Sequence, residues 1–250
     1  MVIDSDTQII YVFGGRVISP DPSHTVYSGL YSYHIPSSTW TLLKSDSSSD
    51  NGVSLRSRIG HSMLFHPVTN QLHIMAGQRA KDYLADHYTY DISTGDVVEV
   101  SRDYSKFGGL EPGFTQRATL DAPTDEIYVL CGLTKDKSSA NESAKSSLWV
   151  LNLKKGKWAK VYQNENVSAE YWDKMKDVEP CPRYAHQLVY EPGVKRLYLF
   201  GGNPGSLTNA RVRLDDFWEL SLSRYPSTDV FERVLIRKTE LQGYPPKSPF

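Results

Sequence analysis

Two stretches decide the fold of this chain: IIYVFGG at residues 9–15 and KRLYLFGG at residues 195–202. Each is a strand-length run of apolar and aromatic residues that ends in two glycines. Weaker copies, LHIMAG at 72–77 and IYVLCG at 127–132, lie between them. The segments 1–15, 63–77, 118–132 and 188–202 share one length and one plan of strand, polar turn, strand and glycine. The sequence therefore predicts a repeat protein whose units stack to cover their apolar faces.

Each unit has room for four short strands. In the last unit these are RYAHQLVY (183–190), KRLYLFGG, DFWELSL (216–222) and VFERVLIR (230–237), each bounded by turn residues. Four-stranded units with paired glycines, a mid-unit aromatic residue and a later tryptophan are typical of kelch blades in a β-propeller. We therefore expect an all-β, incomplete kelch-type propeller. Its units span about 1–45, 58–102, 113–163 and 183–238, followed by a divergent tail at 239–250 that we expect to be disordered.

The first unit is cut short. The chain starts at Met1, where only the tail of the first strand would lie. One cut blade and three complete blades are therefore predicted, and the unpaired strand edges favour self-association.

Composition excludes two classes of partner. The chain of 250 residues has 28 Lys and Arg against 29 Asp and Glu, so no broad cationic surface attracts nucleic acid or anionic lipid. No apolar run approaches the roughly 20 residues of a membrane helix. Only two cysteines are present, Cys131 inside an apolar strand and Cys181 between two prolines, which fits a reducing compartment, and we expect a cytoplasmic protein that also enters the nucleus.

Several repeated residues are interpreted as structural. The paired and single glycines allow close backbone approach or positive φ. The tryptophans fall at the same position in the fourth strand of their units, and Val98 lies near that position in the second unit. We expect the tryptophans to pack between neighbouring blades. The residues are Gly14, Gly15, Gly77, Gly132, Gly201, Gly202, Trp40 and Trp158.

Arg58 with His61, and Arg183 with His186, are compatible with catalysis, because Arg can hold an anion and His can move a proton. However, the pair recurs at the same position in two units, and Gln116 replaces the histidine in the third unit. Recurrence in a repeat favours hydrogen bonds between strands and loops, so we interpret all four as structural.

The sequence pattern shows no set of residues typical of a catalytic site or a metal site. His66, His73 and His87 have no Cys or carboxylate at metal-ligand spacing. The strongest enzyme alternative is a kelch-type copper oxidase resembling galactose oxidase, which needs a Cys-modified tyrosine, whereas Cys131 occupies a glycine position of a core strand. We expect no cofactor and no enzyme activity.

The loops after the glycines carry polar residues that would ring one end of the stack. We take this rim as the candidate protein-binding surface. Its members are Arg16, Gln78, Arg79, Lys81, Lys135 and Asn203. Tyr171 and Trp172, in the insert between the third and fourth units, are further candidates, with local packing as the alternative.

Five stretches carry a more specific resemblance: SRIGHSMLFH (57–66), GFTQRATLDAPTDEIYVL (113–130), EPCPRYAHQLVYE (179–191), YLFGGNPG (198–205) and RLDDFW (213–218). Together they resemble the kelch region of the muskelin family, over nearly the whole chain to about Lys238. The resemblance implies a propeller of six blades, whereas this chain contains fewer repeat units.

The resemblance implies an intracellular scaffold that acts as an oligomerising subunit of the CTLH ubiquitin ligase complex. The predicted partners are therefore ubiquitin ligase subunits and a second copy of the chain. A stand-alone kelch adaptor for another partner, for instance a cytoskeletal one, is the alternative function.

Overall fold

The computed structural model describes residues 1–18, 21, 25–49, 52–130, 132–135, 142–205, 213–225 and 230–239. The protein is all-β, and these residues form four antiparallel sheets of four strands, with two small two-stranded ribbons. Sheet 1 contains β1 (Val2–Asp4), β2 (Ile9–Phe13), β5 (Leu30–His34) and β6 (Thr39–Lys44). Sheet 2 contains β7 (Ser62–His66), β8 (Gln71–Arg79), β9 (Asp82–Asp91) and β10 (Val97–Ser101).

The second half of the chain repeats this plan. Sheet 3 contains β11 (Arg117–Asp121), β12 (Glu126–Leu130), β15 (Ser146–Asn152) and β16 (Lys157–Asn164). Sheet 4 contains β17 (Gln187–Glu191), β18 (Arg196–Gly202), β19 (Leu214–Arg224) and β20 (Phe231–Thr239). The ribbons are β3 (Arg16–Val17) with β4 (Val26–Tyr27), and β13 (Leu133–Lys135) with β14 (Glu142–Ala144).

Three short helices complete the described elements: α1 (Ala169–Met175) in the insert after sheet 3, and the 3-10 turns η1 (Tyr104–Phe107) and η2 (Ala122–Thr124). No helix in the described ranges has the length and apolar character needed to cross a bilayer. The expected disordered tail lies outside the described residues from 240 onward, while Thr239 ends β20.

The first unit contains its first strand, although this strand is short. β1 has three residues, compared with five in β7, and it pairs with β2 through Val2–Tyr11, Ile3–Ile10 and Asp4–Ile9. The first strand of this sheet is therefore short but paired.

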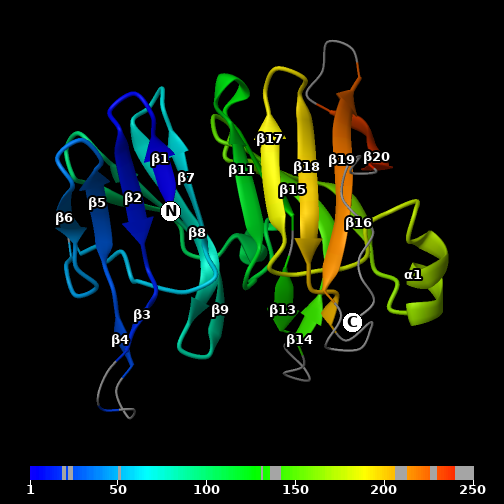
Figure 1. Cartoon of the computed structure of the whole chain (residues 1–250), viewed down its shortest axis with the longest axis horizontal. Helices are drawn as coiled ribbons and strands as arrows, with labels where there is room; N and C mark the ends of the chain where they lie inside the picture. Colours follow the sequence, from blue (N-terminus) through cyan, green and yellow to red (C-terminus); the bar gives the residue numbers. More distant parts are fainter. Residues whose placement is uncertain are drawn as a thin grey trace.

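The sheets stack face to face in chain order. One hydrophobic cluster lies between sheets 1 and 2, a second between sheets 2 and 3, and a third between sheets 3 and 4. We call the face of a sheet that points to the next sheet its forward face, and the other its backward face. Neighbouring first strands also lie side by side, β1 with β7, β7 with β11 and β11 with β17. In Figure 1 these strands occupy the middle, and β6 and β20 lie at the two sides.

Side chains along the second strand of each sheet alternate between its forward and backward faces. Counted back from the second glycine, Leu72, Ile127 and Leu197 are equivalent; all lie on backward faces and are 0% exposed. The equivalent Ile10 of sheet 1 is only partly buried, because no described sheet precedes it.

The two tryptophans differ for the same reason. Trp158 packs between sheets 2 and 3, edge-on to Tyr104 and Trp149, as predicted. The prediction for Trp40 was wrong: its side chain is 58% exposed and contacts only Tyr31 and Tyr33 of its own sheet among the ring contacts described. It occupies the equivalent position on the backward face of sheet 1, where no described sheet covers it.

The position assigned to the second unit was off by one residue. Val97 pairs with Tyr90, as Trp158 pairs with Leu151 and Trp40 with Tyr33. Val97 is 7% exposed and belongs to the core, whereas Val98 is 55% exposed.

The glycines act where the chain passes close to another segment. A Cβ on Gly202 would lie 2.9 Å from the Tyr184 carbonyl oxygen, and one on Gly77 would lie 2.8 Å from that of Ile59. Both glycines also have positive φ. A side chain at either position would therefore push the strand away from the segment that precedes the first strand of the same sheet.

Candidate interaction surface and a buried histidine cluster

The loops after the glycines are fixed at one corner of each sheet. The residue after the glycine forms a backbone bridge with the segment before the first strand: Gln78 with Ile59, Leu133 with Phe114, and Asn203 with Tyr184. Both hydrogen bonds of each bridge measure 2.8–3.0 Å. Because the bridges are equivalent, the β8–β9 turn and the β13–β14 ribbon project from the same end of the stack, and the β3–β4 ribbon of sheet 1 projects from that end as well (Figure 1). We call this end the glycine-end surface.

Four of the predicted rim residues lie on this surface. Arg16 is exposed on β3, and Lys81 is exposed in the β8–β9 turn. The Lys135 ammonium donates to the Lys81 carbonyl oxygen (2.9 Å) and lies 4.6 Å from the centre of the Tyr83 ring. Asn203 is partly buried, and its Oδ1 accepts the Gly205 N–H.

Arg79 has an intramolecular partner. Its Nη1 and Nη2 donate to the two carboxylate oxygens of Asp46 (2.8 and 2.9 Å), and its guanidinium lies 4.2 Å from the centre of the Tyr27 ring. Burial alone would raise the pKa of Asp46, but the hydrogen bonds from Arg79 and from the Ser57 N–H hold it below its usual value. Arg79 thus joins sheet 2 to the segments flanking sheet 1, and a charge reversal there would disturb packing as well as any partner.

The insert aromatics pack locally. Trp172 is buried, and its Nε1 donates to the Asn166 carbonyl oxygen (2.7 Å). The Tyr171 ring meets Trp172 edge-on, and its hydroxyl donates to Glu179. The alternative of local packing therefore describes Trp172 better than a role as an exposed anchor.

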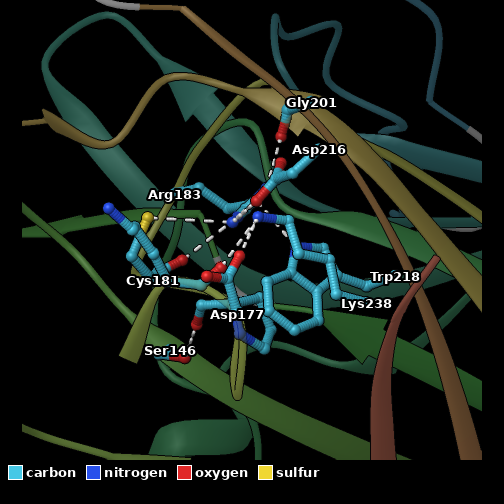
Figure 2. Close-up of polar contacts among 10 residues, drawn as sticks. Ser146, Asp177, Cys181, Arg183, Gly201, Asp216, Trp218 and Lys238 are labelled. Carbon is cyan, nitrogen blue, oxygen red and sulfur yellow. Dashed lines mark hydrogen bonds and ion pairs between the residues drawn. The ribbon is translucent and has the colours of Figure 1, made fainter. Parts of the chain in front are cut away.

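The recurring arginines form buried ion pairs. Arg183 donates from Nη1 and Nη2 to the two oxygens of Asp216 (2.6 and 2.8 Å), and from Nη1 to the Gly201 carbonyl oxygen (Figure 2). Trp218 Nε1 also donates to Asp216 (2.6 Å). Arg58 makes the equivalent contacts with Asp86 and the Ala76 carbonyl oxygen in sheet 2.

The two carboxyl groups respond differently to these pairs. Burial raises the pKa of Asp86 in spite of Arg58, whereas the Arg183 and Trp218 hydrogen bonds outweigh burial and lower the pKa of Asp216. Each pair joins the loop before a first strand to the third strand. This geometry supports the structural interpretation of the arginines.

His61 and His186 are poorly suited to proton transfer. Burial, reinforced by the neighbouring Arg58 or Arg183, lowers the pKa of each imidazole to about 3. Neither ring nitrogen of His186 has a hydrogen-bond partner among the described residues. The His61 ring lies edge-on to Phe13, and the Cβ atom of His186 lies beside Gly202.

A cluster that the sequence spacing did not reveal lies between sheets 2 and 3. His66 Nε2 is 2.8 Å from Asp125 Oδ1, His73 Nδ1 is 2.9 Å from His87 Nε2, and His87 Nδ1 is 2.8 Å from the Tyr104 hydroxyl. We call His66, His73 and His87 the histidine cluster. Each of the three residues is at most 4% exposed.

Burial sets the protonation of His73, His87 and the neighbouring Tyr104. It lowers the pKa of His73 to about 4 and that of His87 to about 3, and it raises the pKa of Tyr104 to about 12. These groups are therefore neutral at pH 7. In the described part of the chain, no group of three or more His, Cys, Asp or Glu side chains is arranged to hold a metal ion. Cys131, on which the oxidase alternative depends, lies outside the described residues.

The cluster could have been found by aligning the four units on their glycines. Three histidines then fall at positions where the other units carry other residue types. Spacing along the chain hides the cluster because its members come from the first, second and third strands of one sheet.

Comparison with known proteins shows a distant relative. No family model matches the chain. The chain is similar to Mei4-dependent protein 6 of Schizosaccharomyces pombe, with 26% identity over 226 residues. The match covers 89% of this chain but 31% of that protein, so the chain spans less than a third of the length of this curated relative.

Proposed function

We propose that this chain is an arc of a kelch-type β-propeller that acts as a non-catalytic scaffold for protein–protein interaction. The architecture is supported by the four sheets in chain order, with their first strands side by side and three inter-sheet clusters built from equivalent positions. In a propeller each blade has two neighbours. The outward faces of sheets 1 and 4 are therefore the surfaces at which the ring continues.

The repeated backbone bridge carries the functional proposal. It holds polar loops of sheets 2, 3 and 4 at one end of the stack, where the β3–β4 ribbon of sheet 1 also projects, so that side chains far apart in sequence form one surface. Loops displayed by a rigid scaffold are where binding residues concentrate. Arg16 and Lys81 extend into solvent there and can approach carboxylates of a partner.

The partner class follows from the resemblance to muskelin: subunits of the CTLH ubiquitin ligase complex, with a cytoplasmic and nuclear location. Binding of the purified subunits to the immobilised chain tests the proposal, and purified actin filaments test the cytoskeletal adaptor alternative.

The informative variant is Arg16→Glu with Lys81→Glu, which leaves the Arg79–Asp46 pair intact. Rim charges act mainly on association, so we expect weaker capture with an unchanged urea midpoint. The matched control is Lys155→Glu with Lys195→Glu, two exposed positions in hairpin turns at the other end of the sheets. Equal capture by both double variants would remove the glycine-end surface from the proposal, and capture of actin alone would replace the ligase partner.

A further inference from the structure

Sheet 2 departs from the repeat at three neighbouring positions. At each of these positions sheet 2 has a histidine, whereas the other sheets have a different residue type. The equivalents of His66 are Asp4, Asp121 and Glu191; those of His73 are Tyr11, Tyr128 and Tyr198; those of His87 are Leu30, Leu148 and Phe217. Three of the seven histidines of the chain are thus gathered on one forward face.

Packing does not require these substitutions. Leu148 is 0% exposed at the position of His87, and Tyr128, at the position of His73, is buried and donates its hydroxyl proton to Glu126. The imidazole of His73 is shorter than a phenol, and its Nε2 is buried without a hydrogen-bond partner in the described part of the chain. A buried polar atom without a partner lowers stability. Departures of this kind from an otherwise consistent plan concentrate at functional sites.

The hydrogen bonds assign the protons. If the Tyr104 hydroxyl donates to His87 Nδ1, then His87 Nε2–H donates to His73 Nδ1, and His73 keeps its proton on Nε2. The opposite direction would leave both the buried Tyr104 proton and the His73 Nε2 lone pair unmatched. The first arrangement leaves a single unmatched group, the His73 Nε2–H donor.

His73 is among the residues that line a cavity of about 390 Å³. Its walls come from sheet 2 and from the turns of sheet 3, and they combine the histidine cluster with hydroxyl, amide and apolar side chains. The lining residues outside the cluster are Thr69, Gln71, Thr89, Val100, Asp125, Leu153 and Lys154.

The charges around the cavity favour an anionic guest. Asp125, the acid in the lining, has both oxygens engaged, Oδ1 by His66 and Oδ2 by the Lys154 ammonium (2.8 Å each). Lys154 remains mostly exposed and has two further protons to donate. The residues that line the cavity therefore include unused donors, and the one carboxylate among them is already neutralised.

We propose that this cavity binds a carboxylate group, which accepts a hydrogen bond from His73 Nε2–H and is attracted by Lys154. The carboxylate belongs either to a small organic acid or to an acidic side chain of a bound protein. The site lies at the hairpin end of the sheets, away from the glycine-end surface, and does not depend on the function proposed above.

The test follows the imidazole signals of the ¹⁵N-labelled chain by NMR during titration with propanoate, at constant ionic strength and pH 7. We expect a saturable shift of the His73 Nε2 resonance. Propanamide has a similar shape without the charge and should bind roughly tenfold more weakly, because hydrogen bonds to charged groups are stronger. A hexapeptide with one glutamate among glycines distinguishes the two sources of carboxylate, according to whether it or propanoate binds more tightly.

The matched variant is His73→Tyr, which restores the residue of the other three sheets and should fold normally. It should abolish the saturable binding, measured by calorimetry, and leave the melting temperature unchanged or higher. A His73 resonance that does not move with either carboxylate would show a cavity filled by solvent only and would overturn the proposal. Equal binding of propanamide, or undiminished binding by His73→Tyr, would overturn it as well.

Discussion

At the scale of single residues, buried ion pairs link the loops to the sheets. Arg183 and Asp216 satisfy one another in a largely buried site, and Trp218 supplies a third donor (Figure 2). Removing one partner of such a pair leaves a buried charge without compensation, whereas replacing both partners with apolar residues avoids that cost.

We therefore expect Asp216→Asn to lower the free energy of unfolding by roughly 3–5 kcal/mol. The double variant Arg183→Met with Asp216→Leu should lose much less. Urea denaturation of the two variants beside the parent chain makes the comparison. A double variant as unstable as Asp216→Asn would mean that the apolar replacements pack poorly and that the buried charge is not the main cost.

A second residue-scale prediction concerns acid. Because burial lowers the pKa of His186 to about 3, the folded chain keeps this ring neutral while the unfolded chain protonates it below about pH 6.5. The unfolded state then binds more protons, so stability is flat above pH 6.5 and falls by roughly 1.4 kcal/mol per pH unit for this histidine as the pH drops toward 3.

Gln116 occupies the position of His186 in sheet 3, so His186→Gln is a natural control. Its urea midpoint should change less between pH 7.5 and pH 5 than that of the parent chain. Identical pH profiles would show that other groups cause the acid sensitivity.

At the scale of elements, the same side chain has different energetic weight in different sheets. Trp158→Ala should cost about 3–5 kcal/mol, because the indole packs between two sheets. Trp40→Ala should cost far less, because its indole contacts only its own sheet and solvent on the described side. Thermal and urea unfolding of both variants measure the difference; similar losses would place a covering segment over Trp40.

The sequence was sufficient for the strands because glycine pairs, alternation and turn residues are local signals. It was insufficient for Trp40, because alternation tells which face a residue lies on but not whether a neighbour covers that face. Val98 was mistaken for Val97 because the two adjacent valines are equally apolar, and apolar character alone does not tell which of them pairs with Tyr90 and joins the core. The histidine cluster was missed because contact across three strands depends on pairing register, which spacing along the chain does not show.

At the scale of the whole molecule, both ends of the stack carry apolar faces. The backward face of sheet 1 contains cross-strand rows in which Ile10 pairs with Tyr33 and Tyr33 with Trp40. The forward face of sheet 4 carries the stacked rings of Tyr198 and Phe217. Inside the stack, faces of these two kinds bury each other three times, so the two ends are complementary.

We therefore expect the isolated chain to self-associate end to end at micromolar concentration. Sedimentation velocity over a range of concentrations measures this. Trp40→Lys with Leu42→Lys should shift the chain toward the monomer, while Phe107→Lys, at an exposed position on η1, should not. Persistent association of the Trp40 and Leu42 variant would direct attention to strand edges.

The sequential order of the strands also bears on how the chain acquires its structure during synthesis. Every sheet is built from one continuous segment of the chain, so each can form as soon as its own segment leaves the ribosome. Its forward apolar face, however, waits for the whole of the next unit to emerge. Nascent chains paused between units would therefore expose one complete, uncovered sheet face at a time, a periodic pattern of chaperone-binding sites spaced by the length of a repeat.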